Sequence, residues 1–345
     1  MFKEFLTRDK KIIGLLFIAA LMIGVAAVWA YSQTKTYVNQ PLKIESSEII
    51  TIPSGSGFGR TLAILTEKGW IDEPTPLARL IPKLYPEITR IKAGTYQIQS
   101  EMSLYQALEV FNLGKEHQFT ITFVEGSRFQ EWMVQMAQDP YLVHELAGLS
   151  EAEIAKRLEI PYEKLEGLFL AETYHYTYGT SDVELLKRAH EKLNRVLDKH
   201  WQQRQEKLPL DNSYEALILA SIIEKETAID EERERVASVF VNRLNKRMRL
   251  QTDPTVIYGM GEAYDGNIRK KDLRTPTPYN TYVINGLPPT PIAMAGEASI
   301  AAALNPENSS YLYFVASGKG GHVFSKTLAE HNRAVRAYLR ELKKR

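Results

Sequence analysis

Residues 216–227 read Ala-Leu-Ile-Leu-Ala-Ser-Ile-Ile-Glu-Lys-Glu-Thr, and this stretch decides much of the fold. Its first eight residues are almost entirely apolar, a pattern typical of a helix buried on nearly all sides. At 3.6 residues per turn, Glu224 continues the packed face, whereas Glu226 is turned away by roughly 200°. The two carboxylates are therefore expected to face opposite ways rather than to work as an acid–base pair.

Glu224 is the catalytic candidate of this helix. Its place at the end of an apolar helix is expected to disfavour the charged form of its carboxyl group. A carboxyl group that stays protonated near neutral pH is what a general acid needs in the cleavage of a glycosidic bond. The alternative interpretation is a structural glutamate that pairs with a lysine or arginine at the helix end.

The chain changes character after Leu250. Residues 251–292 are rich in Thr, Pro, Gly, Tyr and Asn, and a long irregular stretch inside a compact domain is usually functional. Its hydroxyl, amide and carboxylate groups, together with tyrosine rings, suit the hydroxyl rims and apolar faces of a sugar. A loop stiffened by prolines is the alternative. The residues predicted to contact substrate are Gln251, Thr252, Asp253, Tyr258, Tyr279, Asn280, Thr281 and Tyr282.

Helices and strands are expected on both sides of this centre. The order strand, polar turn and amphipathic helix occurs three times, with Ser56, Ser103 and Ser127 as predicted helix N-caps. Residues 213–250 predict two strong helices, 293–304 a helix of small residues and 311–315 a buried strand. The chain ends in a basic amphipathic helix. These elements indicate the α+β class.

An uncharged segment lies near the N-terminus. Residues 12–31 contain no Asp, Glu, Lys or Arg, and a helix of that length spans the hydrocarbon core of a bilayer. Basic residues precede it, which places the N-terminus, residues 1–11, in the cytoplasm. A cleaved signal peptide is the alternative, but the apolar run is longer than usual for one. Residues 32–47 are interpreted as a polar tether to a globular body.

Composition excludes several kinds of chemistry. The net charge is +1, with 43 Lys and Arg against 42 Asp and Glu, so a nucleic acid partner is not expected. The chain has no Cys, which excludes disulfides and a cysteine nucleophile. Its seven His residues show no metal-ligand spacing. We therefore predict neither a metal nor a cofactor, and we interpret His322 and His331 as structural.

Four blocks, in order, resemble the signatures of the endolytic murein transglycosylase (YceG-like) family: ASIIEKET, LQTDPTVIYGMG, TPYNTY and NGLPPTPI. The resemblance implies a single-pass protein of the bacterial inner (cytoplasmic) membrane, with its body in the periplasm. It also implies a small LysM-like α/β subdomain at residues 48–118 and a larger α+β catalytic domain at residues 119–345. The implied partners are peptidoglycan strands and penicillin-binding proteins or other wall synthases.

The implied reaction breaks the β-1,4 bond between N-acetylmuramic acid and N-acetylglucosamine in nascent strands and leaves a 1,6-anhydromuramoyl end. The family's catalytic glutamate is matched to Glu224, which would act first as acid and then as base. Asp253 is a candidate for stabilising the positive charge of the transition state. Two alternatives stay open: a hydrolytic muramidase, and a non-enzymatic peptidoglycan-binding scaffold of the wall synthesis machinery.

Overall fold

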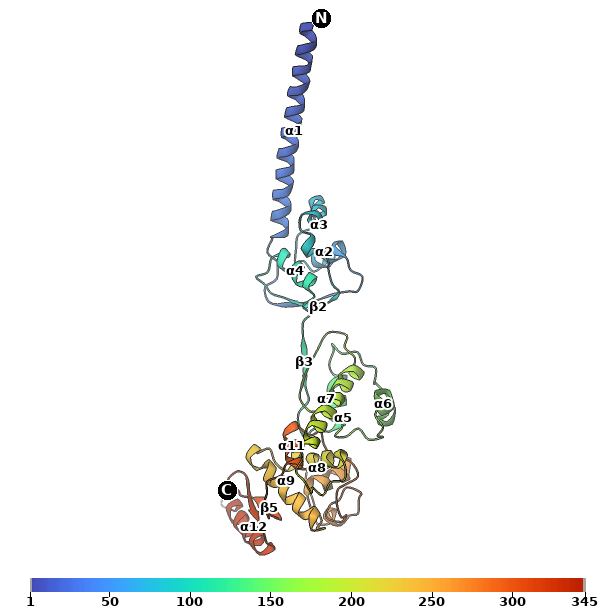
Figure 1. The fold of residues 1–345 in the computed structure, drawn as a ribbon, viewed down its shortest axis with the longest axis vertical. Coiled ribbons are helices and arrows are strands. Elements are labelled where there is room, and N and C mark those ends of the chain that lie inside the picture. The colour runs from blue at the N-terminus through green and yellow to red at the C-terminus, as the bar shows by residue number, and fades with distance from the viewer. Residues whose placement is uncertain (1, 344–345) are drawn as a thin grey trace. The chain divides into compact units, whose positions relative to one another are not determined.

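The computed structural model describes residues 2–343, with side chains from residue 13 onward. Met1 of the expected cytoplasmic tail and residues 344–345 of the expected catalytic domain lie outside it. The chain forms two compact units, Met1–Phe119 and Thr120–Arg345, whose elements are labelled in Figure 1.

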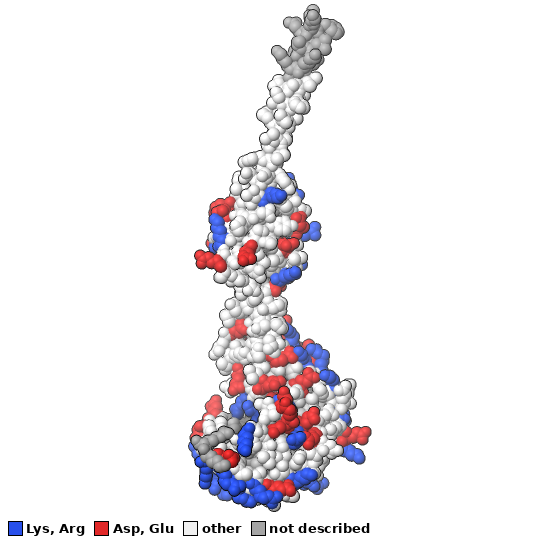
Figure 2. Space-filling model, turned by 90° about the vertical axis from the view of Figure 1, so that its left-hand side faces the viewer, with Lys and Arg blue, Asp and Glu red and all other residues white. Residues whose placement is uncertain are grey.

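The first unit begins with a long helix, α1 (Phe2–Val38). Its stretch Ile13–Val38 is long and apolar enough to cross a membrane, and the large apolar side chains from Ile13 to Tyr31 are exposed. In Figure 2 residues 13–34 of this helix form an uncharged column, whereas acidic and basic residues are intermixed on the rest of the face shown. Exposed apolar side chains of this kind are expected where lipid replaces water as the solvent.

The expected polar tether at 32–47 is not extended. The helix continues to Val38, and Val38, Leu42 and Ile44 are buried in the core of the first unit. The backbone amide of Leu42 donates to the carbonyl of Met102 at 3.0 Å. Because apolar side chains in this polar stretch gain free energy from burial, the segment becomes part of the folded unit.

That core lies between a two-stranded antiparallel sheet and short helices. Strand β1 pairs with β2 in the register Ile50 to Tyr96, and the burial of β1 alternates as expected for a sheet with one covered face. Helices α2 and α4 supply Leu65 and Phe111 to the core. The elements are β1 (Glu48–Ile52), α2 (Phe58–Glu67), η1 (Pro76–Leu80), α3 (Ile81–Leu84), η2 (Pro86–Ile88), β2 (Gly94–Ile98) and α4 (Leu104–Leu113).

The second unit starts with a small sheet and three helices. Strands β3 and β4 form a two-stranded sheet, and the rings of Phe123 and Trp132 stack beside it with centroids 3.9 Å apart. Helix α7 faces the core with buried leucine and alanine side chains, among them Leu185, Ala189 and Leu193. The elements are β3 (Phe119–Thr122), α5 (Phe129–Ala137), α6 (Glu151–Leu158), β4 (Thr173–Tyr176) and α7 (Asp182–Gln202).

Helix α8 forms the centre of the second unit. All residues from Ala216 to Ile223 are buried, as the apolar run predicted, and α7, α9, α10 and α11 pack against the helix. Asn212 caps its start by accepting a hydrogen bond from the amide of Glu215 at 3.0 Å. The helices are α8 (Ser213–Glu226), α9 (Asp230–Asn245), α10 (Asp253–Met260) and α11 (Glu297–Leu304), with η3 (Gly261–Ala263) and η4 (Asp272–Arg274) between the last two.

A hairpin and a final helix complete this unit. Strand β5 (Tyr313–Ala316) pairs antiparallel with β6 (His322–Ser325), and α12 (Leu328–Leu342) contacts both strands. The strand expected to be buried at 311–315 is only half-buried along its length. Tyr313 and Phe314 of this strand border the cavity described below.

Three sequence predictions need correction. Helix α10 lies inside the stretch 251–292 that was expected to be irregular, because Thr252 occupies the N-cap position and Pro254 lies in the first turn, where a proline favours the start of a helix. Of the three serine caps, only Ser103 caps a helix, through a capping box with Gln106. Helix α2 starts after Gly57. Ser127 instead accepts a hydrogen bond from Trp132 Nε1 at 2.7 Å.

Candidate active site

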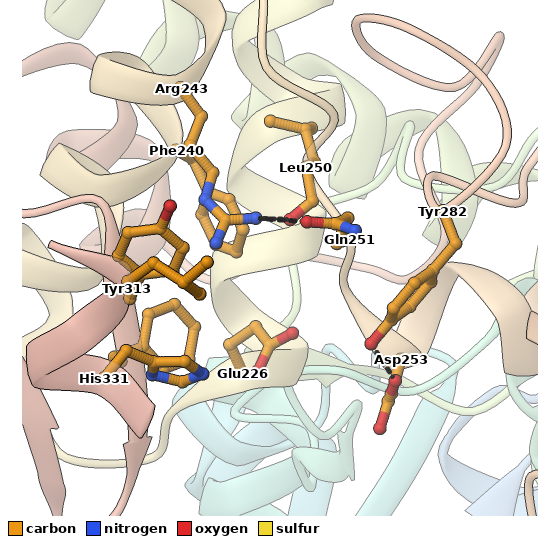
Figure 3. Close-up of a pocket in the computed structure, with 11 residues that line it drawn as sticks. Glu226, Phe240, Arg243, Leu250, Gln251, Asp253, Tyr282, Tyr313 and His331 are labelled. Atoms are coloured by element: carbon orange, nitrogen blue, oxygen red, sulfur yellow. Dashed lines mark hydrogen bonds between the residues drawn. The ribbon is translucent and has the colours of Figure 1, made fainter. Parts of the chain in front are cut away.

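A cavity of about 340 Å³ opens beside the C-terminal end of α8. Figure 3 shows Glu226 near its centre, with Arg243, Tyr313 and His331 on one side and Tyr282 and Asp253 on the other. The wall combines residues from four helices, a strand, the segment before α10 and the loop that carries Tyr282. The lining residues are Glu226, Phe240, Arg243, Leu250, Gln251, Asp253, Tyr282, Tyr313, Phe314, Leu328 and His331.

Glu226 is the last residue of α8, so its side chain lies where the buried helix meets the cavity. Burial raises the pKa of its carboxyl group, and the negative charge of Asp253 raises that pKa further. A hydrogen bond from Thr252 Oγ1 and the positive charge of Arg243 act in the opposite direction. The net effect favours a protonated carboxyl group, as a general acid requires.

Asp253 and Tyr282 form the wall beside Glu226. The Tyr282 hydroxyl group donates to Asp253 Oδ1 at 2.7 Å. Burial, and then this hydrogen bond, raises the pKa of the tyrosine. Asp253 is the first residue of α10, where the positive end of the helix dipole favours a carboxylate. The pair therefore presents a fixed negative charge to the cavity.

Arg243 holds the segment that leads into the cavity. This buried residue of α9 donates through Nη1 to the carbonyl of Leu250 at 2.8 Å and through Nε to the carbonyl of Leu312 at 2.7 Å. Gln251 has a φ of 52°, a conformation that non-glycine residues rarely adopt. The carbonyl of Thr281, 3.1 Å from the amide of Gln251, helps to hold it there.

Glu224, the predicted catalytic residue, has different surroundings. Its Oε2 accepts a hydrogen bond from the amide of Gly296 at 3.0 Å, and it is not among the residues that line the cavity. Glu125 is a neighbour of Glu224. Partial burial raises the pKa of Glu125, and the negative charge of Glu224 raises it further. The neighbouring Lys225 donates to the carbonyl of Gly126 at 2.9 Å. The expectation that Glu224 and Glu226 face different ways agrees with these separate sets of contacts.

The other predicted contact residues divide into three groups, of which the last is an aromatic cluster described in the next paragraph. Three of them border the cavity: Gln251, Asp253 and Tyr282. The second group lies in the surrounding protein. Thr252 and Thr281 are buried and joined by a hydrogen bond of 3.1 Å, and the buried Asn280 donates to the carbonyl of Thr275 at 2.8 Å.

Tyr258 and Tyr279 belong to a separate aromatic cluster, with ring centroids 4.7 Å apart. Arg128 lies over the Tyr258 ring at 5.1 Å. The cluster contains the buried Glu166, which accepts a hydrogen bond from the amide of Phe129 at 3.0 Å. Burial raises the pKa of Glu166 to about 7. These residues line none of the cavity beside Glu226.

The sequence prediction missed one side of the cavity. Arg243, Tyr313 and His331 come from α9, β5 and α12, and His331 had been interpreted as structural. The spacing of these residues along the chain carries no signal, because only the packing of the C-terminal hairpin and α12 brings them to α8. Within residues 13–343, no group of three or more His, Asp or Glu side chains is arranged to hold a metal ion.

Comparison with known proteins shows which family the chain belongs to. The YceG-like family model matches residues 50–337. The chain belongs to the YceG-like family. It is 31% identical over 338 residues to the endolytic murein transglycosylase of Bacillus subtilis, covering 92% of this chain and 91% of that one. The endolytic murein transglycosylase of Streptococcus pneumoniae is 27% identical over 331 residues, which cover 86% of this chain and 59% of the relative.

A solved structure shows the same family fold. The crystal structure of a YceG-like protein from Listeria monocytogenes matches with a TM-score of 0.51 and 30% sequence identity. The match covers 84% of this chain and 99% of the Listeria chain. The α+β class expected from the sequence is therefore confirmed for this YceG-like chain.

Proposed function

We propose that this YceG-like protein is a membrane-anchored endolytic murein transglycosylase. The observation that carries the proposal is the position of Glu226, a carboxyl group with a raised pKa in a cavity that also contains Asp253 and Tyr282. The names of its relatives in Bacillus and Streptococcus support the same reaction class. The proposed bond is the β-1,4 link between N-acetylmuramic acid and N-acetylglucosamine in nascent strands.

In the proposed mechanism Glu226 acts twice. Its carboxyl group gives a proton to the glycosidic oxygen, and the bond from that oxygen to C1 of the muramoyl sugar breaks. The C1 cation is stabilised by the negative charge of Asp253. The C6 hydroxyl group of the same sugar then attacks C1 and returns its proton to Glu226. The product is a 1,6-anhydromuramoyl end, and no water is consumed.

The sequence prediction gives this double role to Glu224, and that assignment remains a prediction. The cavity favours Glu226 because a general acid has to reach the bond that it protonates. The carboxylate of Glu224 is already engaged by the amide of Gly296. Both residues come from the same EKET motif, so substitution of each in turn distinguishes them.

The remaining expectations concern the rest of the chain. We propose that residues 48–118 form a LysM-like module that binds glycan strands. The apolar stretch of α1 would anchor the protein in the inner membrane, with the N-terminus in the cytoplasm and both units in the periplasm. Penicillin-binding proteins are the proposed partners among the wall synthases.

The test uses the full chain in detergent with purified peptidoglycan strands, and mass spectrometry of the products. We expect internal cleavage with anhydromuramoyl ends from the parent chain and none from Glu226→Gln, which keeps the shape of the side chain but has no acidic proton. Hydrated reducing ends would instead identify a muramidase. Intact strands that still bind the protein would identify the non-enzymatic scaffold.

A further inference from the structure

The cavity side formed by Arg243, Tyr313 and His331 has no part in the mechanism above. Arg243 is 8% exposed, and its Nε and Nη1 donate to backbone carbonyls. Within residues 13–343 no hydrogen bond involves its Nη2. Figure 3 shows the guanidinium group extending into the cavity above Tyr313. A buried cation without a carboxylate hydrogen-bonded to it is unusual, because the charge loses its hydration.

His331 adds a second polar group without a partner. Its Nδ1 is buried and makes no hydrogen bond within the described residues. Burial lowers the pKa of the ring, as does the charge of Arg243, so the neutral imidazole dominates near pH 7. A buried donor without an acceptor is rarer in proteins than a buried acceptor without a donor. The unpaired Nδ1 is therefore the nitrogen without hydrogen, and the proton is on Nε2. The ring points toward Glu226 in Figure 3.

Tyr313 holds these two groups in position. Its ring stacks on the imidazole of His331, with centroids 5.2 Å apart and planes inclined by 25°. Its other contact is the guanidinium group of Arg243, 5.1 Å from the ring centroid. The residues come from three different elements, α9, β5 and α12, and both polar side chains keep N–H groups available on the same side of the cavity.

We propose that Arg243 and His331 form a donor subsite that binds a carbonyl or carboxylate oxygen on the sugar next to the cleaved bond. The proposal rests on the proposed function, because that function places the sugar beside Glu226. Two substituents of the substrate carry such an oxygen: the N-acetyl group, and the lactyl carbonyl that bears the peptide stem. Asp253 lies on the opposite wall. When ionised it has no hydrogen to donate to a carbonyl oxygen, and it repels a carboxylate. The substituent is therefore expected to turn its oxygen toward Arg243 and His331.

The test measures kcat and KM of the full chain on glycan strands for His331→Leu and His331→Gln. The leucine removes the donor, whereas the glutamine amide restores an N–H group near the position of Nε2. We expect KM to rise about tenfold in His331→Leu with little change in kcat, and to return most of the way in His331→Gln. Asn332→Ala, an exposed neighbour on α12, is the matched control and keeps the parent KM.

Substrate variants identify the bound group. Strands without N-acetyl groups and strands without peptide stems are compared on the parent chain and on His331→Leu. Loss of the recognised substituent raises KM for the parent but adds nothing in His331→Leu, where the contact is already absent. Additive losses for both strand types would overturn the proposal. Arg243→Lys is expected to reproduce the KM effect, and thermal melting shows whether each variant folds.

Two other results would also overturn the subsite. If His331→Leu lowers kcat and moves the pH profile while KM stays constant, the imidazole serves Glu226 rather than the substrate. If the parent chain cleaves no strand at all, the proposed function fails and the subsite loses its substrate. These outcomes differ in the parent activity, so they separate the two proposals.

Discussion

The C-terminal end of α8 presents two carboxylates to two different regions. Glu224 accepts a hydrogen bond from the amide of Gly296, and a Cβ atom on Gly126 would lie 3.7 Å from Glu224 Cγ. Glu226 borders a cavity in which His331 Nδ1 lacks a hydrogen-bond partner among the described residues. A carboxylate held by a backbone amide indicates a structural role, whereas retained empty space indicates room for a ligand.

The largest expected effect tests this contrast directly. Glu226→Gln is expected to lower the rate of strand cleavage by at least about 10²-fold, the usual scale for loss of a general acid. Glu224→Gln keeps an oxygen that accepts from Gly296 and is expected to reduce the rate less than about tenfold. Cleavage rates of both variants on the same strands decide the matter. The reverse order of effects would restore the sequence prediction of Glu224.

Gly167 lies where the backbone packs closely against the segment around Pro291. Gly167 has a φ of +76°, and a Cβ atom there would lie 2.2 Å from Pro291 Cβ, in the segment that leads to Gly296. Gly167→Ala is expected to lower the free energy of unfolding by about 3 kcal/mol, because backbone strain and overlap add. Gly179 has a φ of +84° with no atom within 4 Å, so Gly179→Ala is expected to cost about 1 kcal/mol. Denaturant unfolding measures both, and equal losses would contradict the role of packing.

Glu166 sharpens the comparison, since it is a buried carboxyl group away from the cavity. Its pKa of about 7 exceeds the ordinary 4.5, so the folded chain binds more protons than the unfolded chain between these values. The free energy of unfolding therefore falls as pH rises from about 4.5 through 7, by roughly 2–3 kcal/mol. Glu166→Gln is expected to flatten this dependence while strand cleavage continues. Thermal melting at several pH values checks the slope, and an unchanged slope would contradict the prediction.

The smallest effect concerns Thr252, whose hydroxyl group donates to Glu226 and lowers its pKa. Thr252→Val removes the donor at nearly constant volume, so the pKa of Glu226 is expected to rise. Because the acid form is the active form, the loss of activity at high pH would move to higher pH. The pH profile of kcat/KM measures the shift. A movement toward lower pH would show that Glu226 is not the acid.

Sequence patterns predicted the regular elements well where one periodicity dominated. The apolar run 216–223 predicted α8 correctly. A helix that is buried on all sides is apolar on all sides, so its prediction does not depend on which segments pack against it. Segment 32–47 and helix α10 were missed, since a few apolar or helix-starting residues in polar surroundings gain their free energy only from tertiary contacts. Of the predicted contact residues, Gln251, Asp253 and Tyr282 border the cavity. The start of α10 and the loop at Tyr282 lie side by side, since the amide of Gln251 donates to the carbonyl of Thr281.

The sequence by itself determined an apolar N-terminal stretch, a buried central helix and the EKET and QTDP motifs of the family. It also determined that the two glutamates of EKET face different ways, because helical geometry is local. Only the tertiary structure decided which of them meets a cavity. That depends on how α9, β5 and α12 close around the end of α8, and packing between segments distant in the chain leaves no periodic signal in the sequence.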